Sequence, residues 1–339
     1  MKEFLERKGV KPSFRKYFVD ALSYMALGLF SSLIIGLIMQ TAGRRIPIPY
    51  FSLLESVGTT AMGLYGPAIG VAVAYGLKAP RLVLFAAVIS GAAGAQLGGP
   101  AGAFIAAILS TEIGKIVSQE TKVDIIVTPF VTIITGVGTA TLIGPIIADW
   151  VEGFGSVIMY STTQQPFIMG ILVAVLMGLA LTAPISSAAI AIMLGLEGLA
   201  AGAATVGCAS QMIGFATSSF RENGWSGFIA LGIGTSMLQI ANIMKNPVIL
   251  IPPTVTAAIL GPFATLVFQM ENNYAGAGMG TSGLVGQIMT VETMGNSGTV
   301  FLSILVLHFL APAILSLLFS EGMRKLGWIK FGDMKIEQT

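Results

Sequence analysis

The chain has 339 residues, of which 54% are hydrophobic and only 10% charged, and its mean hydropathy is +0.85. Soluble domains carry about 25% charged residues, so this composition excludes a soluble protein and indicates an integral membrane protein. One cysteine and one histidine exclude an internal disulfide and a metal site built from these residues. We expect no metal, no cofactor and, because no basic nucleic-acid-binding patch is recognisable, no nucleic-acid partner.

Apolar segments follow one another along most of the chain, and basic residues cluster outside them. Six lysines and arginines precede the first apolar segment and four follow the last. The positive-inside rule therefore predicts that both termini, residues 1–17 and 321–339, are cytoplasmic, and the same side chains would also bind anionic lipid headgroups. We predict spanning or deeply inserted helices at residues 18–41, 53–77, 80–97, 101–118, 125–148, 166–183, 186–207, 209–220, 227–243, 248–270 and 300–319. The segment 209–220 is too short to span alone and is either a half-helix or a continuation of its predecessor.

One block of sequence occurs twice. Residues 103–143 align without a gap with residues 227–267, and 12 of the 41 aligned positions are identical. Pro129 matches Pro253, and each begins the same Pro-x-Val-Thr sequence. A repeat at fixed spacing indicates that one structural unit was duplicated. In an apolar chain, two homologous halves suggest a transporter whose site lies where the halves meet.

Weaker matches extend the repeat upstream, so we assign repeat one to residues 18–148 and repeat two to residues 166–270, with an external link at 149–165. The odd number of predicted spans in the first copy would invert the second copy in the membrane. The predicted fold is an all-α integral membrane protein with about 10–12 transmembrane or re-entrant segments in two inverted repeats. A single final helix, residues 299–320, would place the basic C-terminus outside. We therefore expect residues 271–298 to contribute an additional crossing or an inserted hairpin.

Residues 271–298 are rich in glycine and in uncharged polar side chains. Glycine lets the backbone approach a ligand closely, and irregular backbone at membrane depth is tolerated only against protein or a water-filled cavity. We favour a re-entrant, substrate-lining element over a flexible cytoplasmic loop, because a loop in water rarely has so few charges. The candidate solute-binding residues of this segment are Asn272, Asn273, Thr281, Ser282, Gln287 and Glu292.

Prolines early in two apolar runs mark further candidates for the solute site, at Thr128-Pro129 and Pro252-Pro253. They either break the helix and present backbone groups to a solute or occupy the first turn of an ordinary helix. Asn246, which precedes another proline, offers an uncharged amide to hydroxyl groups. A turn cap is the preferred interpretation of this Asn-Pro pair.

Ionisable side chains inside apolar segments are costly in lipid and are functional candidates by default. Glu112 and Lys115 are three residues apart and are expected to pair with each other, and Glu55 lies near a helix start, where capping explains it. His308 stands alone in an aliphatic helix and is interpreted as a packing residue rather than a proton carrier. Glu292 is the preferred acidic candidate because it lies in the glycine-rich segment. No residue is predicted to be catalytic.

A resemblance to a known family is carried by two runs, NPVILIPPTVTAAILGP (residues 246–262) and GPFATLVFQMENNYAGAGMGTSGLVGQ (residues 261–287). They resemble the membrane-embedded IIC-type family of the phosphotransferase system that includes the perfringolysin O regulator. The resemblance implies a multi-pass protein of the bacterial cell membrane, a homodimer, related to sugar-translocating subunits that receive phosphate from IIA and IIB partners. This chain carries no recognisable IIA or IIB domain, and Cys208 and His308 both lie in apolar segments, so it is not expected to relay phosphate itself.

The sequence thus predicts a transporter of a small polar solute, a sugar or a related hydroxylated metabolite, that works by alternating access. Two alternatives stay open. One is a membrane-embedded sensor that binds a similar solute and signals to a cytoplasmic partner. The other is a IIC subunit that depends on separate IIA and IIB proteins.

Overall fold

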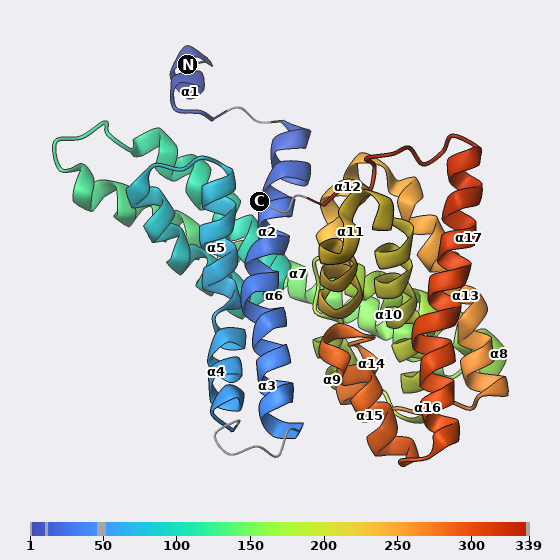
Figure 1. Ribbon diagram of the computed structural model, residues 1–339. Coiled ribbons are helices and arrows are strands. Elements are labelled where there is room, and N and C mark those ends of the chain that lie inside the picture. The colour runs from blue at the N-terminus through green and yellow to red at the C-terminus, as the bar shows by residue number, and fades with distance from the viewer. Residues whose placement is uncertain (1, 11–12, 46–51, 337–339) are drawn as a thin grey trace. The chain divides into compact units, whose positions relative to one another are not determined.

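The computed structural model describes residues 2–10, 13–45 and 52–336, and it is helical along most of that length. No strand forms within these ranges, although a single antiparallel bridge joins Gly198 to Asn272. The chain divides into two compact units, Met1–Trp150 (unit 1) and Val151–Thr339 (unit 2), whose helices are labelled in Figure 1. The all-α fold predicted from the sequence is confirmed.

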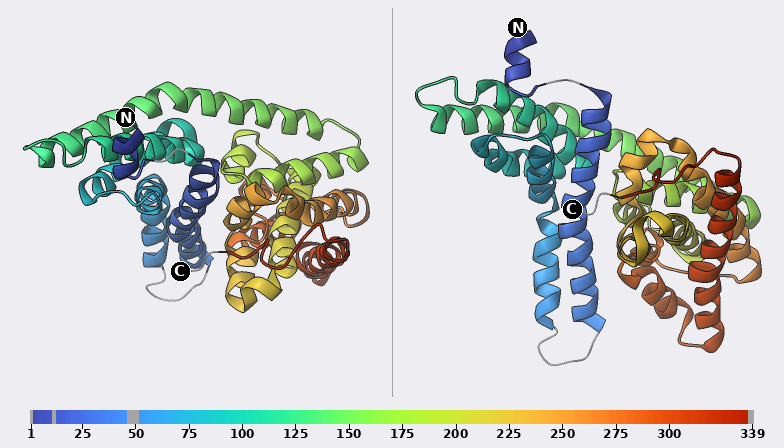
Figure 2. Two further views of the ribbon diagram at one scale, coloured as in Figure 1. Left: turned by 90° about the horizontal axis from the view of Figure 1, so that it is seen from above. Right: turned by 45° about the horizontal axis from the view of Figure 1, so that its top comes forward.

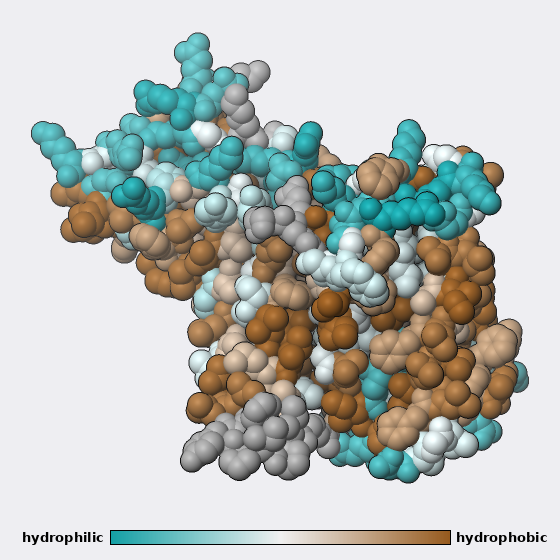
Figure 3. Space-filling view, in the orientation of Figure 1, coloured by the Kyte–Doolittle hydropathy of each residue, from teal (hydrophilic) through white to brown (hydrophobic). Residues whose placement is uncertain are grey.

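Six helices in the described ranges are long and apolar enough to cross a membrane, and there are seven spans if the bent pair α4 (Ser52–Gly63) and α5 (Tyr65–Gly76) counts as one. Unit 2 shows a broad apolar surface between polar edges in Figure 3. Apolar side chains are exposed along its last span, for example Leu302 at 59% and Leu318 at 62%. Such side chains are stable in lipid and not in water, so the protein is a multi-pass membrane protein.

Unit 1 contains the helices up to Trp150, and the last of them continues beyond this residue into unit 2. Besides α4 and α5 they are α1 (Lys2–Arg7), α2 (Leu22–Leu29), α3 (Ile35–Arg45), α6 (Arg81–Val117) and α7 (Asp124–Thr162), with π-helical turns η1 (Lys16–Ala21) and η2 (Phe30–Ile34). The predicted segments 80–97 and 101–118 are the two arms of α6. They meet at Gly98 and Gly99, and Gly99 has φ 61° and ψ −154°, a conformation essentially restricted to glycine.

Helix α7 continues without interruption from Asp124 to Thr162 and contains Pro129 and Pro145 (Figure 2). The predicted break at Thr128-Pro129 is therefore wrong. A proline close to a helix start removes one hydrogen bond, and the turns that follow keep theirs. Residues 149–162, which the sequence assigned to an external link, are the last turns of the same helix.

Unit 2 is built around α10 (Gly198–Ser218), which is buried along nearly its whole length. The predicted segment 209–220 is the continuation of this helix rather than a separate half-helix. Glycines bring the neighbouring backbones close, since a Cβ on Gly207 would lie 1.9 Å from the Ala174 carbonyl oxygen. The helices that accompany α10 are α8 (Pro166–Thr182), α9 (Ser187–Met193), α11 (Phe220–Ile229), α12 (Ile240–Lys245), α13 (Ile251–Pro262), α14 (Tyr274–Ala277), α15 (Val285–Met294), α16 (Gly298–Ile304) and α17 (Ala311–Lys325).

Two segments predicted as single spans are interrupted. The segment 186–207 is split between α9 and α10 at Gly195 and Gly198, which both have positive φ angles, 57° and 59°. The segment 227–243 changes from α11 through the π-helical turn η3 (Ala230–Gly234) to the 3-10 turn η4 (Ser236–Gln239) and α12. Between η3 and η4, Thr235 is extended, with φ −160° and ψ 141°. Residues 220–245, here called the interrupted helix, pack against α10.

Candidate functional site

The glycine-rich segment folds into the interior of unit 2. It forms α14, the 3-10 turn η7 (Ser282–Leu284) and α15, and residues 276–282 are all buried. Helix α14 packs against α9 and α10. A Cβ on Gly280 would lie 2.7 Å from the Ala209 backbone nitrogen, so this turn needs a glycine. The buried position agrees with an inserted element and argues against a flexible loop in water.

Asn272 anchors this segment to the core. Its side chain is 1% exposed, and Nδ2 donates to Thr205 Oγ1 at 2.8 Å and to the Gly286 carbonyl at 3.0 Å. Asn273 is the N-cap of α14, where its Oδ1 accepts from the backbone N–H groups of Ala275 and Gly276. These bonds explain both asparagines as groups that shape the segment.

Thr281 connects the segment to the interrupted helix, because its hydroxyl donates to the Gly232 carbonyl. The side chain is completely buried. The predicted candidates Asn272, Thr281 and Gln287 are thus each buried in unit 2. Glu292, by contrast, is exposed on α15.

Gln287 and His308 form a buried polar pair. Gln287 Nε2 lies 2.9 Å from His308 Nδ1, and the two residues are 8% and 0% exposed. Gln287 Oε1, His308 Nε2 and the Ser282 hydroxyl have no hydrogen-bond partner. Buried polar atoms are nearly always paired, and leaving one unpaired costs about 1–3 kcal/mol. In the described residues, Gln287 and His308 are the uncharged side chains that bond to each other and still keep unpaired buried atoms, so we take them as candidates to bind a polar ligand.

The burial of His308 and the contact of its ring with Gln287 agree with the interpretation as a packing residue, although its Nε2 atom has no partner. The two residues are 21 positions apart and belong to different elements, α15 and the π-helical turn η8 (Leu305–Leu310). Nothing in the local pattern of either element reveals this contact. The available signal was the presence of one polar side chain in each of two neighbouring apolar segments.

A second buried polar network surrounds the interruption at Thr235. Gln211 on α10 donates through Nε2 to Thr254 Oγ1 at 2.9 Å. Thr182 at the end of α8 shares a 2.8 Å hydrogen bond with Ser236 in η4, and its hydroxyl lies 3.5 Å from Gln211 Oε1. The network joins four elements of unit 2, and the sequence prediction missed it. Gln211, an amide within an apolar run, was the signal that could have found it.

The predicted helix break at Pro252-Pro253 is also wrong. Both prolines are buried in the first turn of α13, which follows the 3-10 turn η5 (Pro247–Leu250). The N–H that proline lacks would be unsatisfied there in any helix. Asn246 is the turn cap that was preferred, since its Oδ1 accepts from the Val248 N–H at 3.3 Å. In unit 1, Thr128 donates to Asp124 Oδ1 at 2.5 Å and so belongs to the first turn of α7.

The expected pairing of Glu112 and Lys115 is confirmed, with 3.5 Å between Nζ and Oε1. Lys16 lies closer to the same carboxylate, at 2.6 Å. Glu55 pairs with Arg44 at 2.7 Å rather than acting only as a helix cap. Both carboxylates therefore take part in ion pairs within unit 1.

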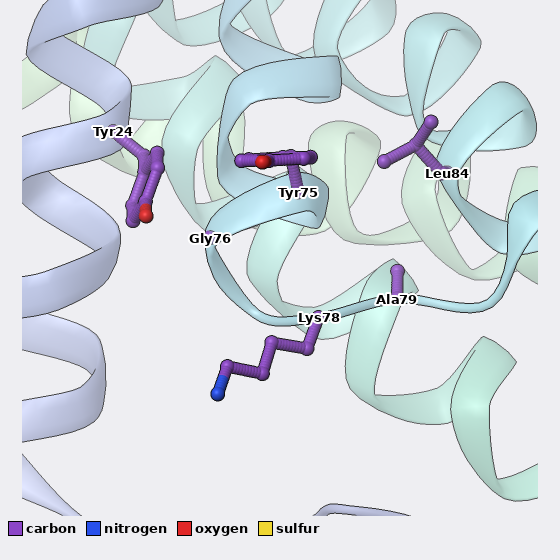
Figure 4. Close-up of a pocket in the computed structure, with 6 residues that line it drawn as sticks. All are labelled: Tyr24, Tyr75, Gly76, Lys78, Ala79 and Leu84. Atoms are coloured by element: carbon purple, nitrogen blue, oxygen red, sulfur yellow. The ribbon is translucent and has the colours of Figure 1, made fainter. Parts of the chain in front are cut away.

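Unit 1 also has an open pocket of about 380 Å³, shown in Figure 4. It lies where α5 ends, and the rings of Tyr24 and Tyr75 meet edge to face there with centroids 5.8 Å apart. Tyr75 is 65% exposed, and Lys78 is exposed as well. No unpaired buried polar atom lines this pocket, so it fits a desolvated polar solute less well than the interior of unit 2 does. Its lining residues are Tyr24, Tyr75, Gly76, Lys78, Ala79 and Leu84.

The helices and the buried polar pair define a multi-pass membrane protein with a polar interior, the class to which permeases belong. Residues 19–336 match the family model described as "Phosphotransferase system, EIIC". The chain therefore belongs to the phosphotransferase-system EIIC family, whose members are membrane permeases that work with the other components of that system. Comparisons with curated proteins and with solved structures found no match.

Proposed function

We propose that this permease moves a sugar or a related hydroxylated metabolite, and that Gln287 and His308 bind it in the interior of unit 2. Within the EIIC family the reaction is coupled to phosphate supplied by separate IIA and IIB proteins. The protein is a homodimer in the bacterial cell membrane with both termini in the cytoplasm, in keeping with the basic residues at both ends.

The observation that carries this proposal is the set of unpaired buried atoms at Gln287 and His308. Because Gln287 Nε2 donates to Nδ1, the neutral imidazole carries its proton on Nε2. The pair then offers an acceptor at Gln287 Oε1 and a donor at His308 Nε2. A sugar hydroxyl both donates and accepts, so this uncharged set matches a polyhydroxylated solute.

Phosphate chemistry belongs on partner proteins in this proposal. Cys208 is 0% exposed in the middle of α10, and a reactive cysteine needs access and an electropositive setting. His308 is equally buried. Neither side chain is accessible to a phosphoryl donor from solution.

Alternating access between two inverted repeats is supported by matched details of the two copies. Thr132 and Thr256 occupy equivalent positions, are both buried, and each donates to the carbonyl four residues earlier at 2.8 Å. Gly99 and Gly224 lie within one residue of equivalence and share the same unusual conformation, with φ 61° and 58° and ψ −154° and −158°. The interruption at Thr235 adds a place where one copy bends.

The test is uptake into liposomes that contain the purified protein. Labelled sugars are screened with and without phosphorylated IIA and IIB proteins, and uptake that requires these partners is the expected result. Binding without flux would instead identify a sensor. Ser303, an exposed hydroxyl near His308 in sequence, bonds only to the Thr299 carbonyl. Ser303→Ala is therefore the control that should transport normally when Gln287→Leu does not.

A further inference from the structure

The C-terminal residues of the chain fold back onto unit 2. Helix α17 ends at Lys325, and residues 327–336, here called the C-terminal strap, then run to α11 and α12, as the dark red trace in Figure 1 shows. Two glycines with positive φ angles shape the strap, Gly327 at 76° and Gly332 at 97°. A Cβ at either position would meet no neighbouring atom, so these glycines serve turns rather than close packing.

Side-chain amides hold the backbone of the strap. Asn223 Nδ2 and Gln239 Nε2 both donate to the Met334 carbonyl at 2.8 Å. Asn242 Nδ2 donates to the Lys335 carbonyl at 2.9 Å. A fourth amide, Asn246 Nδ2, donates to Asp333 Oδ2 at 2.8 Å. The carboxamide cluster is the set Asn223, Gln239, Asn242 and Asn246.

All members of the carboxamide cluster come from the interrupted helix or from the turn that ends it. Gln239 is 0% exposed and Asn242 is 5% exposed beneath the strap. Gln239 belongs to η4, whose first residue, Ser236, bonds to Thr182 in the interior polar network. The short turn η4 therefore contacts the interior network through Ser236 and the strap through Gln239.

The strap has an apolar inner side and an exposed outer side. Ile329, Met334 and Ile336 are buried in a cluster that includes Phe215 of α10. On the outer side, Trp328 is 59% exposed and Phe331 is 76% exposed. Apolar side chains, the amide bonds and the Glu222 carboxylate, which accepts from the Gly332 N–H at 3.4 Å, hold the strap on unit 2. No helix of unit 2 continues into it.

In unit 1, the first copy of the repeat also has a side chain that bonds to the backbone of a terminal segment. Lys115 occupies the position equivalent to Gln239, and its Nζ donates to the Gly9 carbonyl of the N-terminal segment at 2.8 Å. Ser118, equivalent to Asn242, also contacts that segment, because its carbonyl accepts from Lys8 Nζ. Each repeat thus uses the same helix position to hold the backbone of a chain terminus. Because the contact recurs at matched positions, we do not interpret it as an incidental docking of a chain end.

We propose that the C-terminal strap is a displaceable cover, and that its release exposes the carboxamide cluster at the end of the interrupted helix to solution. Uncharged amides bond to hydroxyl groups as readily as to backbone carbonyls, so the opened cluster suits entry or exit of a polyhydroxylated solute. The covering itself is independent of the proposed function. Its consequence for transport rests on that function.

Accessibility of single cysteines to N-ethylmaleimide tests the cover without knowledge of the solute. In a Cys208→Ala background, Gln239→Cys is compared in the full chain and in a chain lacking residues 328–339. Deletion should raise the labelling rate at least tenfold. The matched control is Ser210→Cys on α10, a fully buried site whose labelling should stay slow in both chains. Unchanged labelling at position 239 would overturn the proposal. Fast labelling at position 210 in the shortened chain would also overturn it, because the strap would then be an indispensable part of the fold rather than a cover.

A milder variant keeps the strap but weakens its apolar contacts with unit 2. Met334→Asp should raise labelling at position 239 in the full chain while leaving position 210 slow. A crosslink between Gln239→Cys and Met334→Cys should abolish uptake of a labelled sugar, and reduction should restore it. Normal uptake with the crosslink closed would overturn the gating role. If the wild-type protein takes up none of the sugars tested, the proposed function fails while the labelling result stands.

Discussion

The two units hold their chain termini with different chemistry at equivalent positions. In unit 1, Lys115 and Glu112 are buried with Lys16 beside them, and the N-terminal segment docks onto these charges. In unit 2 the equivalents of Glu112 and Lys115 are Ser236 and Gln239, which are neutral. The matched positions therefore contact a terminal segment in both units, with charged groups in unit 1 and hydroxyl and amide groups in unit 2. At these matched positions unit 1 uses charged groups and unit 2 uses uncharged ones, while the ion pair beneath the strap of unit 2 joins Arg324 to Glu222.

The largest expected effect comes from removing the buried charge in unit 1. Lys115→Met deletes the donor to the carbonyls of Gly9 and Leu77 and leaves Glu112 with Lys16 alone. Breaking a buried pair costs about 3–5 kcal/mol, and with Lys16 remaining we expect about 2–3 kcal/mol. The equivalent change in unit 2, Gln239→Leu, should cost about 1 kcal/mol, the loss of neutral hydrogen bonds. Thermal unfolding in detergent measures both, and equal losses would contradict the comparison.

A smaller effect is expected from salt, which should change the proteolysis rates of the two terminal segments differently. Lys8 Nζ lies 2.5 Å from Glu120 Oε1, and Arg7 lies 3.4 Å from the same atom. Exposed pairs of this kind weaken as the Debye length falls from about 10 Å at 0.1 M salt to about 3 Å at 1 M. Limited proteolysis should therefore cut the N-terminal segment faster in 1 M salt and affect the C-terminal strap less, because the Arg324–Glu222 pair beneath the strap is buried and weakly screened. Equal acceleration at both ends would remove the distinction.

The smallest effect is a pH dependence confined to the N-terminal segment. The hydrogen bond from Lys8 lowers the pKa of the Glu120 carboxyl below its ordinary value. A carboxyl whose pKa is lowered in the folded state contributes stability above its unfolded pKa, and this contribution is lost as the pH falls through the folded value. Release of the segment should accordingly increase below about pH 4. Glu120→Gln should abolish that dependence in a proteolysis assay, and a pH response that survives in this variant would assign it to another group.

The sequence predicted the features that depend on composition and periodicity. Hydropathy identified the membrane protein, and the low charge of residues 271–298 agrees with the burial of residues 276–282. The prolines misled because Pro129, Pro252 and Pro253 lie near helix starts, where proline is tolerated. The interruptions lie elsewhere, at glycines with positive φ angles such as Gly99 and Gly224 and at the extended residue Thr235.

Contacts between distant segments were beyond prediction from the sequence. Asn246 was correctly preferred as a turn cap, but its bond to Asp333 joins residues 87 positions apart. The pairing of Gln287 with His308 could not be predicted for the same reason, because in the sequence each side chain is one polar group in an apolar helix. Tertiary packing decides which of these groups are satisfied and which are left to bind a ligand.

Equilibrium binding of the transported sugar to Gln287→Leu, His308→Phe and the double variant tests the proposed site most directly. Each single change should weaken binding at least tenfold, and the double change should add little, because the two side chains act as one unit. Ser303→Ala should bind like the unchanged protein. Wild-type affinity in folded Gln287→Leu and His308→Phe proteins would contradict the assignment of the solute site to this pair.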